Sequence, residues 1–575
     1  MRNLLLARKW GSAFVWALPV LFLALFYFYP LGSIVVFALQ RLAQDGGESL
    51  RDLNWAYLGR VFGFTVYQAT LSTILTVIAG LPAAYLFARY EFRGKALLRS
   101  LSTIPFVLPT LVVAASFNAL FGPRGWANLA ALNLLGFREA PFTLTNSLTA
   151  ILIAHVFYNL TIVLRLVGDV WSRLDPRLAQ AARCLGATPW QAFWKVTLPL
   201  LLPAIFSAAL LVFIFDFTSF GVILILGGPR YATLEVEIYY QMIALFNLPA
   251  AVLLSLIQLG CTLGLTVIYH RLSEIVTRPL PLASQKRVLA RLSRPSQKIF
   301  AFLIIAFLFV FQILPLLALV GRSFVYAGWE RGERGLSIPT LSFTAYQEIF
   351  INRRASLFYI PPIRAIGISV AYGLITVFLG LLLGLAAAWF LSRQHDSPAL
   401  ERLRRSLEPL ILLPLGTSSV TLGLGFLLAF GKAPFDLRSS PLLIPLAHTL
   451  VAFPFIVRSL LPALRSIRPR YHQAAAVLGA NQWEIARRVD LPIIGRAVLV
   501  AGVFAFGISM GEFGATALLT RPEYPTLPIA IYRFLGQPGE LNYGQSMALS
   551  VLLMSITAAG MILIERFRSG EVGEF

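Results

Sequence analysis

Charged side chains are scarce in this sequence. Only 13% of its 575 residues are charged, 58% are hydrophobic, and the mean hydropathy is +0.75. A water-soluble body of this size needs more polar surface than this composition supplies. Glycine and proline are scattered singly rather than in repeats, which excludes a fibrous chain. The composition therefore excludes a soluble enzyme and predicts a chain that lies mostly in lipid.

Cysteine and acidic residues are also few. Cys184 and Cys261 lie on separate segments without the spacing of a metal site, so no cofactor and no metal are expected. Asp and Glu total 26 against 48 Lys and Arg, a net charge of +22. A nucleic-acid partner would require a basic face on a soluble domain, and the sequence has none. We therefore attribute the positive charge to orientation in the membrane.

Long apolar segments make up most of the chain. About 20 apolar residues cross a bilayer as a helix. Twelve spans are predicted, at 13–39, 64–87, 105–121, 144–167, 200–226, 248–268, 299–320, 365–391, 409–430, 441–461, 498–519 and 546–564. The predicted fold class is all-α, a polytopic membrane protein of about 12 transmembrane helices.

The loops between these spans predict the orientation. Lys and Arg are about twice as frequent in loops on the side of the amino terminus as in loops on the other side. The positive-inside rule therefore places both termini in the cytoplasm. The segment 271–298 carries seven basic residues, one acid and three prolines. We expect a first half at 1–270, a cytoplasmic basic linker at 271–298 and a second half at 299–575.

An internal repeat relates the two halves. Residues 176–199 match residues 469–492 at a constant offset of 293, with twelve identities in 24 positions. An even number of spans precedes the second copy, so both halves share one orientation. They should then be related by an axis along the membrane normal, with a translocation path at their interface.

The repeated segment follows the fourth span of each half on the cytoplasmic side. Asp175 and Pro176 form a helix start, with a side-chain acceptor followed by a ring that needs no N–H partner. Gly186 can adopt positive φ and is expected to end that helix. Thr188 starts a second helix, and Asn481 does so in the other copy. Each copy predicts a protruding elbow of helix, sharp turn and helix.

Both copies resemble a motif of the inner-membrane permeases of type I ABC importers. That motif is Glu-Ala-Ala, three residues, Gly, and a Leu-Pro pair about eleven residues later; this chain has Gln in place of Glu in both copies. The resemblance implies that each elbow docks on an ATP-binding subunit, present in two copies, and that a soluble substrate-binding protein meets the outer face. The candidate coupling residues are Gln180, Ala181, Ala182, Gly186, Ala187 and Trp190, with Gln473, Ala474, Ala475, Gly479, Ala480 and Trp483.

Two other interpretations remain open. The repeated segment would also serve as a plain hairpin between two spans, although a tether needs neither the glycine nor an exposed tryptophan. Two six-span halves also occur in ion-gradient-driven secondary transporters, which need no elbows. The sequence has no phosphate loop of the form G-x-x-x-x-G-K-[ST], so the chain itself is expected not to be an enzyme. A partner subunit would then hydrolyse ATP.

The choice of substrate is left open by the sequence. A fused pair of permease halves of this length resembles the thiamine and ferric-iron importers. The stretch 226–235, Leu-Gly-Gly-Pro-Arg-Tyr-Ala-Thr-Leu-Glu, is most similar to thiamine permeases. The stretch 511–515, Gly-Glu-Phe-Gly-Ala, is shared among iron, thiamine and anion permeases. The resemblance implies thiamine or ferric iron.

Two acids lie within predicted spans. Asp216 and Glu512 fall in the fifth and eleventh spans, where an acid is costly unless it faces the bundle interior or a wet path. The repeat aligns Asp216 with Ser509, and Ser219 with Glu512. These four residues are the candidate translocation path for a cation. The alternative is that each carboxyl group caps a helix or pairs with a nearby arginine.

Two further pairs of residues match across the repeat. His155 and His448 lie on apolar helices and are expected to bond a neighbouring span rather than a metal ion. Tyr239 and Tyr532 are expected to belong to the belt of aromatic residues at the membrane surface.

Overall fold

The computed structural model describes most of the chain. The described residues are 17–45, 51, 53–134, 137, 141–142, 144–276, 289–326, 340–351, 361–393, 398–431 and 436–568. The start of the first predicted span, the centre of the predicted linker and the last seven residues lie outside them.

The helices and strands follow one another along the chain, and η marks a π or 3₁₀ helix. The first half contains η1 (Ala24–Phe28), α2 (Tyr29–Asp45), α4 (Trp55–Arg89), β1 (Tyr90–Glu91), α5 (Lys95–Leu101), α6 (Ile104–Val107), α7 (Thr110–Phe121), α8 (Trp126–Leu134), α9 (Leu148–Arg173), α10 (Pro176–Cys184), α11 (Pro189–Ala192), η2 (Phe193–Thr197), α12 (Leu198–Phe217), α13 (Gly221–Leu226), η3 (Pro229–Tyr231), α14 (Leu234–Tyr239), η4 (Tyr240–Ala244) and α15 (Leu248–Val276). The second half contains β2 (Ala290–Arg291), α16 (Pro295–Gln312), α17 (Leu314–Ser323), β3 (Val325–Tyr326), β4 (Thr340–Leu341), α18 (Thr344–Glu348), α19 (Pro362–Ser392), α20 (Pro398–Leu412), η6 (Leu413–Gly416), α21 (Ser419–Ala429), α22 (Leu443–Arg465), α23 (Pro469–Val477), α24 (Gln482–Ile485), η7 (Ala486–Asp490), α25 (Leu491–Gly511), α26 (Gly514–Leu519), α27 (Leu527–Leu535) and α28 (Glu540–Arg568). The strands form two short pairs, β1 parallel to β2 and β3 antiparallel to β4.

The all-α prediction is confirmed. Within the described residues, ten helices are long and apolar enough to cross a membrane, and two bent helix pairs bring the number to twelve if each pair is one span. The bent pairs are 95–107 with 110–132, and 398–416 with 419–429, with bends of 105° and 102°. They coincide with the predicted third and ninth spans. Each predicted span therefore has a helical counterpart.

The predicted fifth and eleventh spans are too long. They were expected to run to residues 226 and 519, but α12 ends at Phe217 and α25 at Gly511, and short helices α13 and α26 follow. Glu512 starts the second of these, because its carboxylate accepts the backbone N–H groups of Ala515 and Thr516 at 2.8 and 3.1 Å. Both sides of each break are apolar, so hydrophobicity alone cannot reveal it.

Three long helices form the centre of each half, α4, α9 and α12 in the first and α19, α22 and α25 in the second. Glycines allow the first two helices of each set to approach closely. A Cβ atom at Gly80 would lie 2.7 Å from Val163, and one at Gly384 would lie 2.4 Å from Ile456. Such small residues are typical of helix contacts in membranes, where packing replaces the hydrophobic effect between helices.

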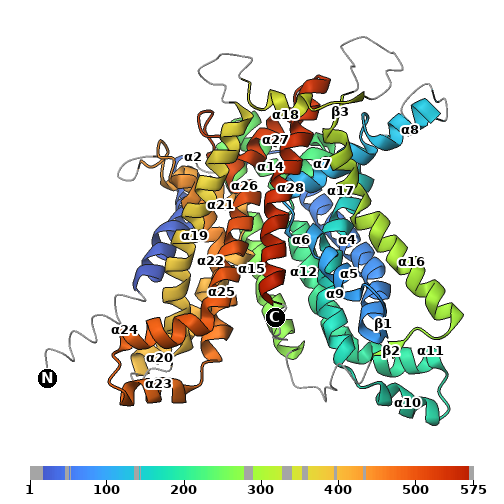
Figure 1. Ribbon diagram of the computed structural model, residues 1–575. Helices are drawn as coiled ribbons and strands as arrows, with labels where there is room; N and C mark the ends of the chain where they lie inside the picture. Colours follow the sequence, from blue (N-terminus) through green and yellow to red (C-terminus); the bar gives the residue numbers. More distant parts are fainter. Residues whose placement is uncertain are drawn as a thin grey trace.

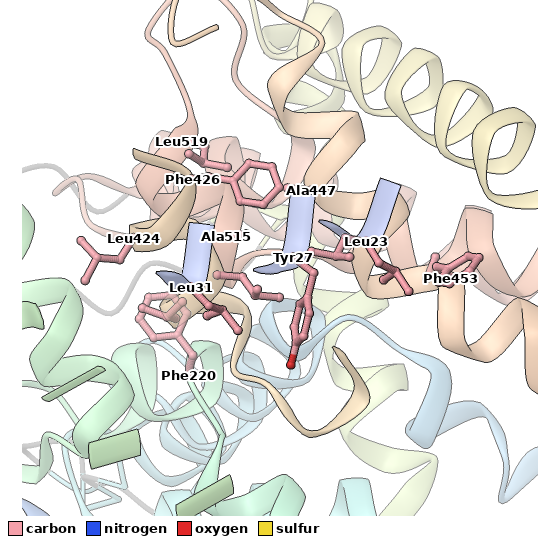
Figure 2. Close-up of a cluster of buried hydrophobic side chains, with 14 of the residues drawn as sticks. Leu23, Tyr27, Leu31, Phe220, Leu424, Phe426, Ala447, Phe453, Ala515 and Leu519 are labelled. Carbon is pink, nitrogen blue, oxygen red and sulfur yellow. The ribbon is translucent and has the colours of Figure 1, made fainter. Parts of the chain in front are cut away.

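The first span of each half packs against the other half. Figure 2 shows Leu23, Tyr27 and Leu31 of the first span among residues of α21, α22 and α26. The hydroxyl of Tyr27 is 2.7 Å from that of Thr417. In the reciprocal arrangement α17 packs against α7, and the indole of Trp126 on α8 donates to the carbonyl of Ala318 on α17 at 3.0 Å. The two halves are therefore interlocked.

A buried ion pair fastens one end of this assembly. The fully buried Arg322 of α17 bonds Glu540 of α28 and lies over the ring of Tyr543 at 5.1 Å. Arg124, which follows α7, is 3.6 Å from the same carboxylate. The contacts join both halves at the end opposite α10 and α23, as Figure 1 shows. The ribbons of the two halves diverge toward the end that carries α10, α11, α23 and α24.

Candidate functional site

The first repeated segment folds as the predicted elbow. Asp175 accepts the backbone N–H of Arg177 at 2.9 Å and caps α10. Gly186 has φ of +93°, which ends the helix in the left-handed region. Thr188 and Gln191 then form a reciprocal capping box that starts α11. These local interactions explain why the sequence alone predicted the turn.

The second repeated segment has the same shape with different caps. Gly479 has φ of +84° and follows α23. Asn481 accepts the N–H of Glu484, and the Glu484 carboxylate accepts the N–H of Asn481, both at 2.9 Å. Nε2 of His472 on α23 lies 2.6 Å from the carboxylate Oδ1 of Asp490 on η7. The helix-turn-helix geometry is thus confirmed in both copies.

Both elbows expose apolar side chains. Leu185 and Trp190 are 90% and 68% exposed on the first elbow, and Leu478 and Trp483 are 87% and 75% exposed on the second. The two elbows lie at the same end of the molecule, on opposite sides (Figure 1). Of the remaining predicted coupling residues, Gln180, Ala181, Gln473 and Ala474 are exposed, and Ala182, Ala187, Ala475 and Ala480 are half-buried. Exposed apolar surface of this kind marks a place where a partner binds.

An aromatic cluster joins the halves at the break after α12 and α25. Phe220 and Phe513, which the 293-residue offset pairs, stack with ring centroids 5.2 Å apart. Each ring also contacts a tyrosine of its own half at 5.5 Å, Tyr239 or Tyr532. We call Phe220, Phe513, Tyr239 and Tyr532 the aromatic seal.

The aromatic seal corrects one prediction. Tyr239 and Tyr532 were expected in the belt at the membrane surface, but they lie between the halves, because each ring packs on the phenylalanine at the adjacent helix break. The stacking of Phe220 on Phe513 was missed. The repeat already marked the two as an identical pair, and a pair close to a twofold axis can meet across it.

A buried acid also connects the halves. Glu235 on α14 accepts a hydrogen bond from Ser418, the cap of α21, at 2.6 Å and one from Gln258 at 2.9 Å. Burial raises the pKa of the Glu235 carboxyl to about 8, against the lowering effect of these two hydrogen bonds. Sequence reasoning missed this residue, although an acid inside the apolar stretch 232–240 was a signal.

In the first half, a histidine cluster surrounds Asp216. His155 on α9 places Nε2 2.9 Å from the Ser219 hydroxyl and Nδ1 3.4 Å from the carboxylate Oδ1 of Asp216. Ser72 on α4 lies 3.1 Å from Nδ1, and Asn159 donates to the same carboxylate oxygen at 2.7 Å. The other oxygen, Oδ2, is buried without a hydrogen-bond partner in the described part of the chain.

In the second half, the acid is Glu512, at the position equivalent to Ser219 rather than to Asp216. His448 lies 2.8 Å from Ser509 through Nδ1, and Nε2 lies 2.8 Å from Thr516 and 3.3 Å from Glu512. Thr376 of α19 contacts Ser509 at 3.3 Å. The prediction that both histidines bond a neighbouring element is confirmed. Glu512 also caps a helix, as the alternative interpretation expected.

The four predicted path residues are thus brought together in two pairs, one pair around each histidine. Asp216 and Glu512 are almost fully buried, at 1% and 7% exposure. Their hydrogen bonds described above stay within their own half. The residues that immediately follow Ser219 and Glu512 are the two phenylalanines of the aromatic seal. Contact with cargo stays a prediction.

A family profile described as "binding-protein-dependent transport system inner membrane component" matches residues 76–278 and 380–569, one stretch in each half. The chain belongs to this family. It is a non-catalytic, multi-pass inner-membrane permease component of an ABC transporter, and the family works with ATPase and binding-protein partners in general. This assignment sets aside the secondary-transporter alternative.

Several relatives of this permease match along most of its length. The thiamine transport system permease protein ThiP of Salmonella typhimurium is 28% identical over 510 residues, 88% of this chain and 89% of the relative. The protein of the same name from Brucella abortus is 27% identical over 550 residues, 95% and 94% of the two chains. A probable ABC transporter permease protein, y4fN of Sinorhizobium fredii, is 25% identical over 558 residues, 95% and 92% of the two chains.

Proposed function

We propose that this permease imports thiamine, with its two elbows docked on a pair of ATP-binding subunits. The observation that carries the coupling role is the pair of exposed apolar elbows at one end of the molecule. The elbow end faces the cytoplasm, as the excess of Lys and Arg in its loops favours, and both termini lie on that side. A soluble binding protein delivers substrate at the opposite face.

The translocation path runs between the halves and is closed by the aromatic seal. Helix α12 begins next to the first elbow and ends at Phe217, so Phe220 lies at the end of α12 away from the elbow. The same relation holds for α25 and Phe513. A movement of the elbows is therefore transmitted along rigid helices to the two stacked rings. Opening the path separates these rings and exposes Asp216 and Glu512, with Ser219 and Ser509, to the passing cation.

Thiamine is the favoured cargo because several relatives that match nearly the full chain carry that name. The path residues fit an organic cation, since two carboxyl groups and four aromatic rings lie at the closure. Ferric iron was the other substrate implied by sequence resemblance, and it would need several hard oxygen ligands together. Among the residues that the structure describes, no group of three His, Cys, Asp or Glu side chains could hold a metal ion.

The coupling role is tested by cross-linking. Cys184 is exposed on α10, and the offset places Val477 at the equivalent position of α23. In membranes that contain the complex, a thiol-to-amine cross-linker should join the native chain to the ATPase through Cys184. C184S, which retains the half-buried Cys261, is the matched control and should lose the product. C184S/V477C should restore it through the second elbow. Absence of ATPase from both products refutes the coupling.

Cargo is tested separately by uptake. The complex with its binding protein in proteoliposomes should accumulate labelled thiamine only with ATP inside, and W190A/W483A should lower uptake at least tenfold. F378A is the control, because Phe378 is an exposed aromatic residue near the middle of α19, away from both elbows. Uptake of iron but not thiamine would overturn the cargo while leaving the coupling intact.

A further inference from the structure

A cationic pocket lies beside the first elbow, apart from the aromatic seal. It has a volume of about 60 Å³, which is room for roughly four water-sized groups. Three of its lining residues are basic, Lys95, Arg99 and Arg165, and one is acidic, Asp169. The proposed function assigns no role to any of them.

The polar lining of the pocket includes four hydroxyl groups, three of which already donate to the backbone carbonyls of Arg99, Ser102 and Asp169. Hydroxyl groups line it at Ser102, Thr103, Thr161 and Ser172. The Ser102 residue is 3% exposed, and its hydroxyl is buried without a hydrogen-bond partner in the described part of the chain. A buried hydroxyl without a partner is costly, and a ligand that accepts its hydrogen would remove that cost. This orphaned group points to an acceptor-rich ligand.

The basic side chains are held in place around that hydroxyl. Arg165 donates to the Thr103 hydroxyl at 2.8 Å, Lys95 donates to the carbonyl of Tyr90 at 2.8 Å, and Arg99 pairs with Asp169 at 2.5 Å. Lys95 also pairs with Glu91 at 3.4 Å. An arginine has five N–H donors and a lysine three. Ordered cations next to hydroxyl donors are the usual partners of a phosphate group.

The second half retains two of the three basic residues, because the alignments place Arg404 and Arg458 at the positions of Lys95 and Arg165, but it does not retain the hydroxyl groups. The repeat places Pro454 and Arg465 at the positions of Thr161 and Ser172. Aligning the bent pairs at their breaks, Thr110 with Ser419, places Ile411 and Leu412 at the positions of Ser102 and Thr103. None of the four hydroxyl groups is retained. The hydroxyl groups of the pocket are thus specific to the first half, whereas two of its basic residues recur in the second half.

We propose that this pocket binds a phosphate ester, supplied by a phospholipid headgroup or by a soluble phosphate compound. A lipid source is compatible with the apolar part of the lining, Phe87, Leu164 and Leu289. Basic pockets between helices at the cytoplasmic surface bind anionic headgroups in other membrane proteins. Asp169 and Ser172 lie in the last turns of α9, immediately before the elbow, so occupancy would stiffen the attachment of the elbow.

The test measures binding to the full chain in detergent, without transport. Melting is followed by tryptophan fluorescence with phosphatidylglycerol, with phosphatidylcholine and with inorganic phosphate. We expect phosphatidylglycerol or inorganic phosphate to raise the melting temperature. The K95Q/R165Q variant should bind the stabilising ligand at least tenfold more weakly than the native chain. R458Q, at the position equivalent to Arg165 in the second half, should bind as the native chain does. Stabilisation by the lipid alone identifies a headgroup site, and stabilisation by inorganic phosphate identifies a soluble source.

A second variant controls for the possibility that K95Q/R165Q misfolds. S102L fills the pocket without changing a charge, so it should abolish the shift while retaining the ligand-free melting temperature within a few degrees. The proposal is overturned if no phosphate compound shifts melting, or if K95Q/R165Q and S102L bind as tightly as R458Q. Because no cargo or ATPase is present, this outcome is independent of the proposed import of thiamine.

Discussion

The two histidine clusters each contain one acid, but the acid occupies a different position of the repeat in each half. His155 faces its acid at position 216 and a hydroxyl at 219, whereas His448 faces a hydroxyl at 509 and its acid at 512. Each imidazole therefore has one carboxyl and one hydroxyl neighbour from the break that follows a long helix. Each cluster therefore contains a single acid, which can occupy either the first of the two positions, as Asp216 does, or the second, as Glu512 does.

The exchange yields a prediction about stability. D216A removes the acceptor of Asn159 and the carboxyl neighbour of His155, and we expect a loss of about 2 kcal/mol, because partners that stay buried lose their hydrogen bonds. D216S/S219E reproduces the arrangement of the second half and should regain at least half of that loss. Thermal unfolding in detergent measures both. Equal stability of D216A and the native chain would contradict the role of the cluster.

Glu235 predicts a dependence of stability on pH. Its pKa rises from 4.5 to about 8 in the folded chain, so the folded state holds its proton more tightly than the unfolded state. Its contribution to stability is therefore greatest below about pH 4.5, falls as the pH rises toward 8, and levels off above that. E235Q should melt at a temperature that changes less between pH 5 and pH 8 than the native melting temperature. Parallel melting profiles would contradict this assignment.

At the scale of elements, helix packing in each half depends on close approach at a glycine. Gly80 contacts Val163 and Gly384 contacts Ile456, at equivalent crossings of α4 with α9 and of α19 with α22. In the proposed function, the rigid bundles that result carry a movement of the elbows to the distant aromatic seal. Loose crossings would absorb the movement within each half.

The Gly384 crossing also yields a stability prediction. G384A places a methyl group 2.4 Å from the Ile456 side chain and should destabilise the chain by about 1–3 kcal/mol through overpacking. The control is G367A in the same helix, where nothing lies within 4 Å of the new methyl group. That variant should be neutral or slightly stabilising, because alanine favours a helix over glycine. Similar melting temperatures for the two variants would contradict the packing argument.

On the scale of the whole molecule, the halves are interlocked rather than merely adjacent. The first span packs on α21, and α17 packs on α7, so each half completes the other. The buried pair of Arg322 and Glu540, with Arg124 beside it, adds a polar fastening at the end opposite the elbows. The stacked rings of Phe220 and Phe513 lie within this frame, and in the proposed function they separate when the bundles move relative to it.

Interlocking predicts how a divided chain will behave. If the chain is broken after Leu280 and both pieces are expressed together, they should copurify as a stable complex, because each first span still binds the opposite half. Removing residues 1–46 from the first piece deprives α21 of its contact and should reduce copurification several-fold. Copurification is measured through a tag on the second piece. Undiminished recovery of the shortened piece would show that the first span contributes little to the association of the two halves.

The approximate positions of the spans, the repeat and the shape of the elbows could be predicted from the sequence. These are local properties: apolar length sets a span, and Asp175, Gly186 and Thr188 set helix ends through bonds to their own neighbours. Only the tertiary structure decided which half each first span joins, where the fifth span breaks, and that Phe220 meets Phe513. The physical reason is that an apolar residue facing lipid and one facing a distant helix look alike in sequence, so packing alone distinguishes them.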